Sequence, residues 1–333
     1  MTENKPISRM PPEIVEHMTI FHPYTLRRLT EVENTNMRFV HYTSADVGLK
    51  ILDSGTVWMR QVSCMNDYSE VEHGLQCISN AWRGSHGLRL RTALDARFPG
   101  VVKEIEEQFN GVQNSLRFDT FVTSLSEHAG PGHDDEEQYG RLSMWRAYAR
   151  GVGVALVIRN ASLWTADTSL GLYTTPVAYL SDEAFAEELG IIAANIEARG
   201  DYLDRIGRDW LRHAVIMALS AAAVSTKHPG FREEREWRIV RTPNYPFPCP
   251  LQRVTQTVSN VPQTVLLLAL KDDTSVGRVG IEPPALLDRI IIGPTDYPMP
   301  IYNAYLEQMK KSGIAEAEKK LKISFLPLRN SSA

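Results

Sequence analysis

The sequence is poor in cysteine and has no long apolar run. Its 333 residues include three cysteines, Cys64, Cys77 and Cys249, which are widely spaced and form no CxxC pair. This usage favours a reducing compartment over a disulfide framework and argues against a zinc ribbon. The longest apolar run, 214–224, is too short to span a bilayer, and the first residues, MTENKPISRM, lack the apolar core of a signal peptide. We therefore expect a cytoplasmic protein without membrane contact.

A strong excess of one charge is also lacking. The chain has 36 lysines and arginines against 40 aspartates and glutamates, a net charge of -4. This balance argues against indiscriminate binding to nucleic-acid phosphates, although a local basic groove stays compatible with it. The hydrophobic content of 43% is that of a globular protein with a sizeable core.

Internal repeats, low-complexity tracts and dividing linkers are absent from the sequence. We therefore expect one α+β domain over 37–330, with a helical insertion at about 182–225. Residues 1–36 contain prolines and are expected to form an N-terminal arm or a peripheral helix.

Several catalytic signatures are missing. The sequence has no GxxxxGK phosphate loop, no GxSxG elbow and no HExxH helix. Gly151 and Gly153 lack a third glycine and precede a predicted strand rather than a helix, so they fail the dinucleotide-binding fingerprint. They indicate a turn that leads into a strand. The missing signatures argue against the ordinary hydrolase families.

The most informative stretch that is present runs from Arg38 to Asp67. Its first residues predict a strand that ends in the polar cluster His41, Tyr42 and Thr43. Alternate strand residues share a face, so His41 and Thr43 are expected to point the same way. Ser44 is a candidate N-cap of a following helix, Gly55 is its natural stop, and 56–60 predicts a second strand.

The rest of the chain alternates helical and strand patterns. Strands are expected at 119–125, 153–159, 175–179, 236–241, 264–270, 288–292 and 322–326. Helices are expected from about 67, within 88–109, over 182–224 with a break near 200, and over 299–312. This order predicts the α+β class.

Four short clusters carry a resemblance. They are HYT at 41–43, MNDYSE at 65–70, SMWRAYARGVG at 143–153 and EEREWRIV at 233–240. Together they resemble a bacterial family of uncharacterised proteins, a domain of unknown function, over about 38–293. The segment between Tyr148 and Gly153 lacks the histidine of the family pattern, which weakens any role built on that loop.

That family frame in turn resembles the ADP-ribosyltransferase fold, a mixed split sheet with flanking helices. The resemblance implies NAD as substrate. It also implies that His41 contacts the adenosine-side ribose, Thr43 contacts the nicotinamide-side ribose, and Tyr148 stacks on nicotinamide. The same implied NAD-binding set includes Tyr42, Trp58 and Arg238, and the implied catalytic residues are Glu236 and Glu234.

The chemistry explains those residue types. Cleavage of the nicotinamide glycosidic bond builds positive charge on the ribose, which a carboxylate stabilises while it orients or deprotonates the acceptor. If Glu234 and Glu236 alternate on one strand, they share a face, and one carboxyl with a raised pKa would divide the duties with the other. Arg238 would extend this face and hold a phosphate bidentately.

Each residue also has a structural interpretation. His41 would be a satisfied histidine at a strand end, with Thr43 capping the next helix in place of Ser44. Glu234, Glu236 and Arg238 would be a solvated strand face with cross-strand ion pairs.

Other residues favour structural roles more clearly. Asn66 and Asp67 are typical of an Asx turn or an N-cap, although Glu70, one turn on, could face the cleft. Tryptophans near strands are mainly core candidates: Trp58, Trp145 and Trp237. The acids and histidines of the next loop match no metal-ligand spacing: His128, His133, Asp134 and Asp135.

Two functions from different classes remain. The first is an enzyme that transfers ADP-ribose from NAD to an unknown protein or nucleic-acid acceptor, or to a small one. The type of family suggests a toxin or an antiphage defence effector. The second is a noncatalytic nucleotide- or protein-binding module of the same fold. Phosphotransfer or hydrolysis in a related cleft is a third possibility.

Overall fold

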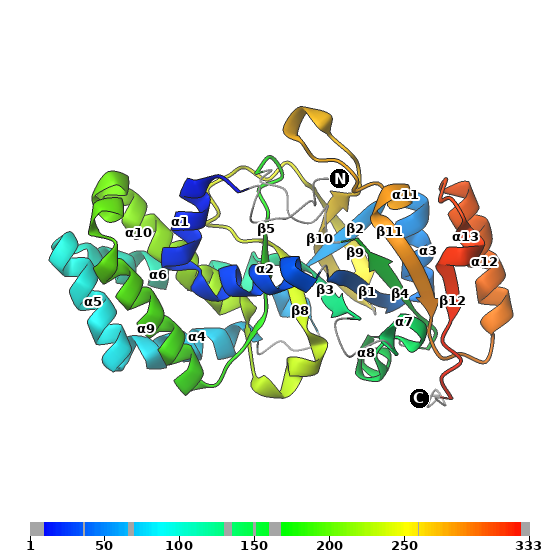
Figure 1. Ribbon diagram of the computed structural model, residues 1–333, viewed down its shortest axis with the longest axis horizontal. Coiled ribbons are helices and arrows are strands. Elements are labelled where there is room, and N and C mark those ends of the chain that lie inside the picture. Colours follow the sequence, from blue (N-terminus) through cyan, green and yellow to red (C-terminus); the bar gives the residue numbers. More distant parts are fainter. Residues whose placement is uncertain are drawn as a thin grey trace.

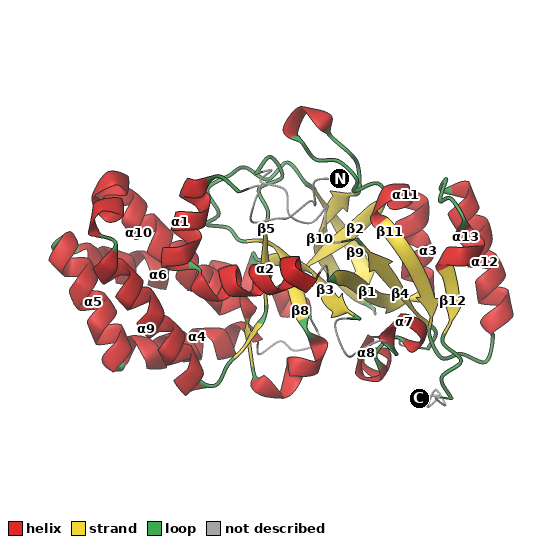
Figure 2. Cartoon of the chain, viewed as in Figure 1, coloured by secondary structure: helices red, strands yellow, loops and turns green. Residues whose placement is uncertain are grey.

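A computed structural model describes residues 10–35, 37–65, 70–129, 135–148, 151–159, 168–258 and 260–327. The described residues form a helical half and a strand half, with β5 and β8 between them (Figures 1 and 2). The class is α+β, as the alternating patterns predict. Among these residues, every helix is too short or too polar to cross a bilayer.

The strand half is a ten-stranded sheet whose main path runs β12-β11-β4-β1-β3-β2-β10-β9, with β8 and β5 branching from β3. The strands are β1 (Arg38–Ser44), β2 (Thr56–Gln61), β3 (Phe121–His128), β4 (Gly153–Ile158), β5 (Tyr173–Pro176), β8 (Glu236–Arg241), β9 (Gln252–Val258), β10 (Val261–Ala269), β11 (Leu287–Ile292) and β12 (Leu321–Ile323).

The sheet splits beside β3. Strand β8 pairs with β3 over 121–126, so β1 and β2 share the opposite edge of β3. Strand β1 pairs with its far end, through Val40 and Ser126, and β2 pairs with its start, through Arg60 and Val122. The two strands therefore diverge along the middle of β3, where His41 lies.

The helical half consists of α4 (Glu70–Arg83), α5 (Ser85–Arg97), α6 (Val101–Phe118), α9 (Asp182–Ala198) and α10 (Gly200–Ser225). Helices α4 and α10 pack with very close backbones, because a Cβ atom on Gly74 would lie 2.4 Å from the carbonyl oxygen of Ala223. This contact requires glycine, and it holds the start of α4 near the end of α10.

Short elements complete the fold. They are α3 (Ala45–Ser54), η2 (Val62–Cys64), α7 (Glu136–Tyr139), α8 (Leu142–Tyr148), β6 (Ala178–Tyr179), β7 (Thr226–Lys227), η4 (Pro229–Glu234), η5 (Thr274–Val276), α11 (Pro283–Leu286), α12 (Pro298–Lys311) and α13 (Ala317–Lys320). The turn at Gly151, with φ +77°, enters β4 at Gly153.

The segment before residue 37 is more than an arm. It contains α1 (Pro12–Phe21) and α2 (Pro23–Thr35), which α9 contacts. Ile20 and Phe21 are buried in the core of the helical half, whereas Leu29 and Val32 pack against Phe39 of β1. Residues 12–35 therefore join the cores of the two halves.

Candidate functional site

A cluster of charged side chains lies buried where the helical half meets the sheet. Its members are Glu70 from α4, Lys227 from β7, Glu234 from the end of η4, and Glu236 and Arg238 from β8. We call these five residues the carboxylate cluster. Three acids and two bases thus meet in a small volume that water hardly reaches.

Lys227 is the centre of the cluster. Its Nζ lies 2.6 Å from Glu234 Oε2, 2.7 Å from Glu70 Oε1 and 3.0 Å from Glu236 Oε2. The Lys227 side chain is 4% exposed, so these contacts replace its hydration. The three donor positions of the ammonium group are therefore matched by three carboxylates.

Glu236 is saturated by protein donors. Its Oε1 accepts from Ser124 Oγ at 2.5 Å and from Arg238 Nε at 2.7 Å, while its Oε2 accepts from Lys227 and from Arg238 Nη2, each at 3.0 Å. Arg238 and Lys227 outweigh the effect of burial and hold the pKa of Glu236 well below its usual range. Glu236 is thus a fixed negative charge.

Glu234 has the opposite electrostatic character. Burial raises its pKa, and the hydrogen bond and charge of Lys227 offset this shift in part. Its side chain is 16% exposed, more than any other acid of the cluster. The two carboxyls therefore share one lysine but have pKa values shifted in opposite directions.

A turn of the backbone brings Glu234 to Lys227. The expected alternation of Glu234 and Glu236 on one strand is wrong, because Glu234 ends η4 and β8 begins at Glu236. Between them Arg235 has φ +44° and ψ 50°, the left-handed region that arginine rarely adopts. This residue separates the end of η4 from the start of β8, and the two carboxylates from these elements reach the same cation.

Arg238 has no free face for a phosphate. Its Nη1 donates to the carbonyl oxygen of Val224 at 2.6 Å, and Nη2 also donates to Glu70. The residue is 1% exposed. The expected bidentate phosphate contact is therefore incompatible with this structure, and Arg238 instead ties β8 to α4 and α10.

Two tyrosines border the cluster. The hydroxyl of Tyr148, the last residue of α8, donates to Glu234 Oε1 at 3.1 Å, and burial raises the pKa of this tyrosine. The hydroxyl of Tyr179 accepts from the backbone N–H of Glu236 at 2.9 Å. Tyr148 thus lies beside the more exposed carboxylate, whereas Tyr179 fixes the start of β8.

His41 lies next to the cluster but on another face of the sheet. The register joins Val40, Ser126 and Glu236 across three strands, so Glu236 shares their face and the neighbouring His41 has the opposite one. In the split, His41 Nδ1 donates to the carbonyl oxygen of Ser124 at 2.9 Å. One residue, Ser124, therefore links His41 to Glu236.

The other NAD contacts that the resemblance implies on β1 and β2 are Tyr42, Thr43 and Trp58. Tyr42 is buried, and its hydroxyl accepts from the backbone N–H of Arg141 at 2.8 Å. Thr43 is half-buried on the face of His41, and Ser44 rather than Thr43 caps α3 by accepting from Val47. Trp58 is half-buried opposite Leu267 of β10.

The candidate metal ligands near the end of β3 are described only in part. His128 is fully buried at the end of β3, and burial lowers its pKa to about 3. Within the described residues, no group of three His, Cys, Asp or Glu side chains is placed to hold a metal ion. The candidates Asn66, Asp67, His133 and Asp134 lie outside the described residues. Trp145 and Trp237 are core residues, at 3% and 1% exposure.

Sequence reasoning missed Lys227, Ser124 and Tyr179. Lys227 follows an apolar helix as a lone cation, and no motif distinguishes it from a lysine on the surface. Its one signal is position: it lies two residues after the end of α10 and seven residues before Glu234. Glu70, which the sequence places one turn after Asn66 and Asp67, contacts Lys227 and Arg238 in the carboxylate cluster.

The comparisons with known proteins give one match. No curated protein and no solved structure matches the chain. A family model does match, over a stretch that includes Tyr148 and four of the five members of the carboxylate cluster, all except Glu70. A domain of the DUF2971 family, described as a protein of unknown function, is found at residues 144–239.

Proposed function

We propose that the protein cleaves NAD at the nicotinamide glycosidic bond and transfers ADP-ribose to an acceptor, on an ADP-ribosyltransferase-like sheet. One observation carries the proposal: Glu234 and Glu236 share Lys227, yet their pKa values are shifted in opposite directions. Pairs of carboxyls separated in this way divide acid–base and electrostatic duties in enzymes that cleave glycosidic bonds.

The two carboxylates take different roles. Glu236 stays ionised and supplies the fixed negative charge that stabilises the cationic ribose of the transition state. Glu234 is the more exposed and the more readily protonated, so it orients the acceptor and takes its proton. Lys227 holds both carboxylates, and Tyr148 positions Glu234 through its hydroxyl.

His41 has the face of the sheet opposite Glu236, so in this proposal it contacts the adenosine-side ribose and not the reacting ribose. A carbonyl oxygen only accepts, so His41 Nδ1 carries the proton toward Ser124. Burial lowers the pKa of His41, which keeps the ring neutral at pH 7 and leaves Nε2 as an acceptor for a ribose hydroxyl. Arg238 is not a partner for the diphosphate, because Val224, Glu70 and Glu236 already accept its hydrogen bonds.

The test measures nicotinamide release from NAD in the presence of a bacterial lysate as the source of acceptor. Glu234→Gln keeps the size of the side chain but removes the base. We expect it to lower the rate about 100-fold or more while NAD affinity changes little, because the lost interaction belongs to the transition state. Glu233→Gln is the matched control, since Glu233 is exposed and adjacent.

Labelled NAD identifies the acceptor class. After reaction, separate protease and nuclease treatments show whether the label is on protein or on nucleic acid. Wild-type protein that neither binds NAD nor releases nicotinamide in any lysate would contradict the proposal, and so would equal rates for Glu234→Gln and Glu233→Gln.

A specific observation favours a second candidate, a noncatalytic nucleotide- or protein-binding module. Each carboxylate oxygen of Glu236 already accepts two hydrogen bonds from protein donors, and its side chain is 6% exposed. In this case the cluster is structural. NAD binding without nicotinamide release, with Glu236→Gln changing stability alone, would favour the module over the enzyme.

A further inference from the structure

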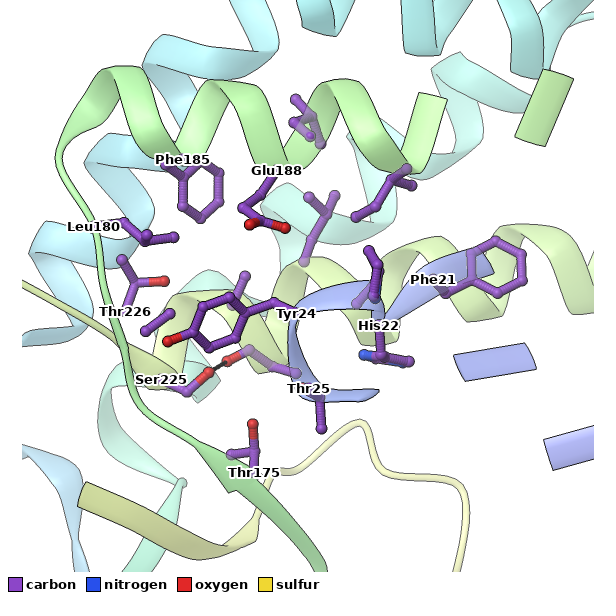
Figure 3. Close-up of a pocket in the computed structure, with 18 of the residues that line it drawn as sticks. Phe21, His22, Tyr24, Thr25, Thr175, Leu180, Phe185, Glu188, Ser225 and Thr226 are labelled. Atoms are coloured by element: carbon purple, nitrogen blue, oxygen red, sulfur yellow. Dashed lines mark hydrogen bonds between the residues drawn. The ribbon is translucent and has the colours of Figure 1, made fainter. Parts of the chain in front are cut away.

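A pocket lies beside the carboxylate cluster, between α2, α9, α10 and β5. Figure 3 shows its lining, with Phe185 and Leu180 on one side and the Tyr24 ring opposite Glu188. The walls are mostly apolar, with Leu189, Ile192 and Leu219 among them. The cavity measures about 90 Å³, the volume of roughly three water molecules in the liquid. It therefore suits a small ligand.

One carboxylate oxygen in this pocket has no partner. Glu188 Oε1 accepts from Arg27, but Glu188 Oε2 is buried and accepts no hydrogen bond from the described residues. The carboxylate lies inside the pocket in Figure 3, between Phe185 and Tyr24. A buried oxygen without a partner is costly, and a ligand that donates to it would remove this cost.

The other polar groups of the pocket do not supply this donor. The Tyr24 hydroxyl donates to the carbonyl oxygen of Val177 at 3.4 Å, and the Ser225 hydroxyl donates to the carbonyl oxygen of Ala221 at 2.6 Å. Burial, reinforced by His17, lowers the pKa of His22 to about 3, so this histidine is neutral. Arg27, the cation on Oε1, has a side chain that is 47% exposed and lies toward solvent.

The pocket is distinct from the carboxylate cluster. The two-residue strands β6 and β7 pair in parallel, Ala178 with Thr226 and Tyr179 with Lys227. Ala178 and Thr226 line the pocket, whereas Tyr179 and Lys227 reach the cluster. The paired strands β6 and β7 therefore separate the pocket from the carboxylate cluster.

We propose that this pocket binds a small primary amine with a short aliphatic chain. The chain packs among Phe185, Leu180 and Leu219, and the ammonium group donates to Glu188 Oε2. Mostly apolar walls with one placed polar group are typical of small-molecule sites. A charge-assisted hydrogen bond to a carboxylate selects the amine over a neutral alcohol and over an anion. This binding does not depend on the proposed NAD chemistry.

The test uses butylamine, butanol and butyrate as probes of equal chain length, at pH 7 and constant ionic strength. Saturation-transfer NMR on the full chain reports their binding. We expect butylamine to bind most tightly and butyrate least. Glu188→Gln is expected to weaken the binding of butylamine ~10-fold or more and to leave the binding of butanol nearly unchanged. Glu187→Gln, on the exposed face of the same helix, is the matched control.

A second variant tests the place of binding. Ala222 lines the pocket and is half-buried, so Ala222→Leu fills the hollow and should abolish butylamine binding. Circular dichroism confirms that each variant is folded, and Glu188→Gln decides alone if Ala222→Leu does not fold. Butyrate binding as tightly as butylamine, absence of butylamine binding, or equal butylamine affinity in wild type and Glu188→Gln overturns the proposal.

Discussion

The protein contains two kinds of ion pair, and they differ in surroundings. In the helical half, Arg89 of α5 donates twice to Glu197 of α9, at 2.9 and 2.5 Å, with side chains that are 48% and 41% exposed. In the carboxylate cluster, Lys227 meets three acids at similar distances but is 4% exposed. The distances between the charged atoms are comparable, but the exposure of the side chains to solvent is not.

The low exposure of the carboxylate cluster gives it a desolvation cost that the exposed pair does not have. Exposed pairs are screened by water and salt and contribute little. Buried pairs lose the hydration of both partners, so apolar side chains of similar size often serve stability equally well. A buried network of five charges beside a split sheet is therefore more informative about function than a surface pair is. The following variants test this contrast.

Lys227→Met should have the largest effect. It leaves Glu70, Glu234 and Glu236 facing one another with Arg238 as the remaining cation. Removing one partner of a buried ion pair costs about 3–5 kcal/mol, and we expect a loss of this size in the free energy of unfolding by urea. The control is Lys103→Met, because Lys103 is 82% exposed. Equal stabilities of the two variants would contradict the contrast.

Glu236→Gln should give a difference that depends on pH. The pKa of Glu236 is lowered on folding, so its ionised form contributes stability above the unfolded value, near 4.5, which is lost as the pH falls through the folded value. The stability gap between wild type and Glu236→Gln, on the order of 2 kcal/mol, should therefore narrow from pH 6 to pH 3. Thermal unfolding across this range measures it, and a gap that stays constant would refute the assignment.

Gly74→Ala should have a smaller effect, through packing instead of charge. The new methyl group would meet the backbone of Ala223 and push α4 from α10, at a cost of about 1–3 kcal/mol. Gly111→Ala, on α6, meets nothing within 4 Å and should stabilise the protein by about 0.5–1 kcal/mol. Chemical unfolding of both variants compares two glycine positions in helices of one half.

Glu197→Gln should have the smallest effect. The pair with Arg89 is exposed, so the melting temperature should change little, and the change should shrink further at high salt because screening weakens exposed pairs. A loss of stability as large as that of Lys227→Met would mean that the exposed and the buried ion pairs do not differ in their contribution to stability. Melting curves at low and high salt decide this point.

Local signals in the sequence predicted much of the fold. Ser44 caps α3 by accepting from the backbone N–H of Val47, and Gly55 ends this helix at φ +60°, as expected. The strand at 236–241 is also confirmed. Each of these depends on residues near one another in the chain. By contrast, β9 was missed, because its polar residues, QRVTQTV, lie at an exposed edge without an apolar run.

The site was predictable only in part. Glu234 and Glu236 were expected to share a strand face. Both side chains do contact Lys227, but they do so because Arg235 between them has a left-handed backbone conformation. An arginine gives no sign of this conformation in the sequence. Lys227 and Ser124 come from other elements, and their roles exist only after the two halves have packed. Sequence patterns report local structure, and this cluster is made by contacts between distant segments.

The separation of these segments along the chain has a consequence for folding. The ion pair between Glu70 and Arg238 joins residues that are 168 positions apart, and it connects the helical half to the sheet. A partly folded chain with one half complete would bury unpaired charges at this junction, which is costly. The cluster therefore penalises half-folded states, and we infer that it makes the two halves fold and unfold as one cooperative unit.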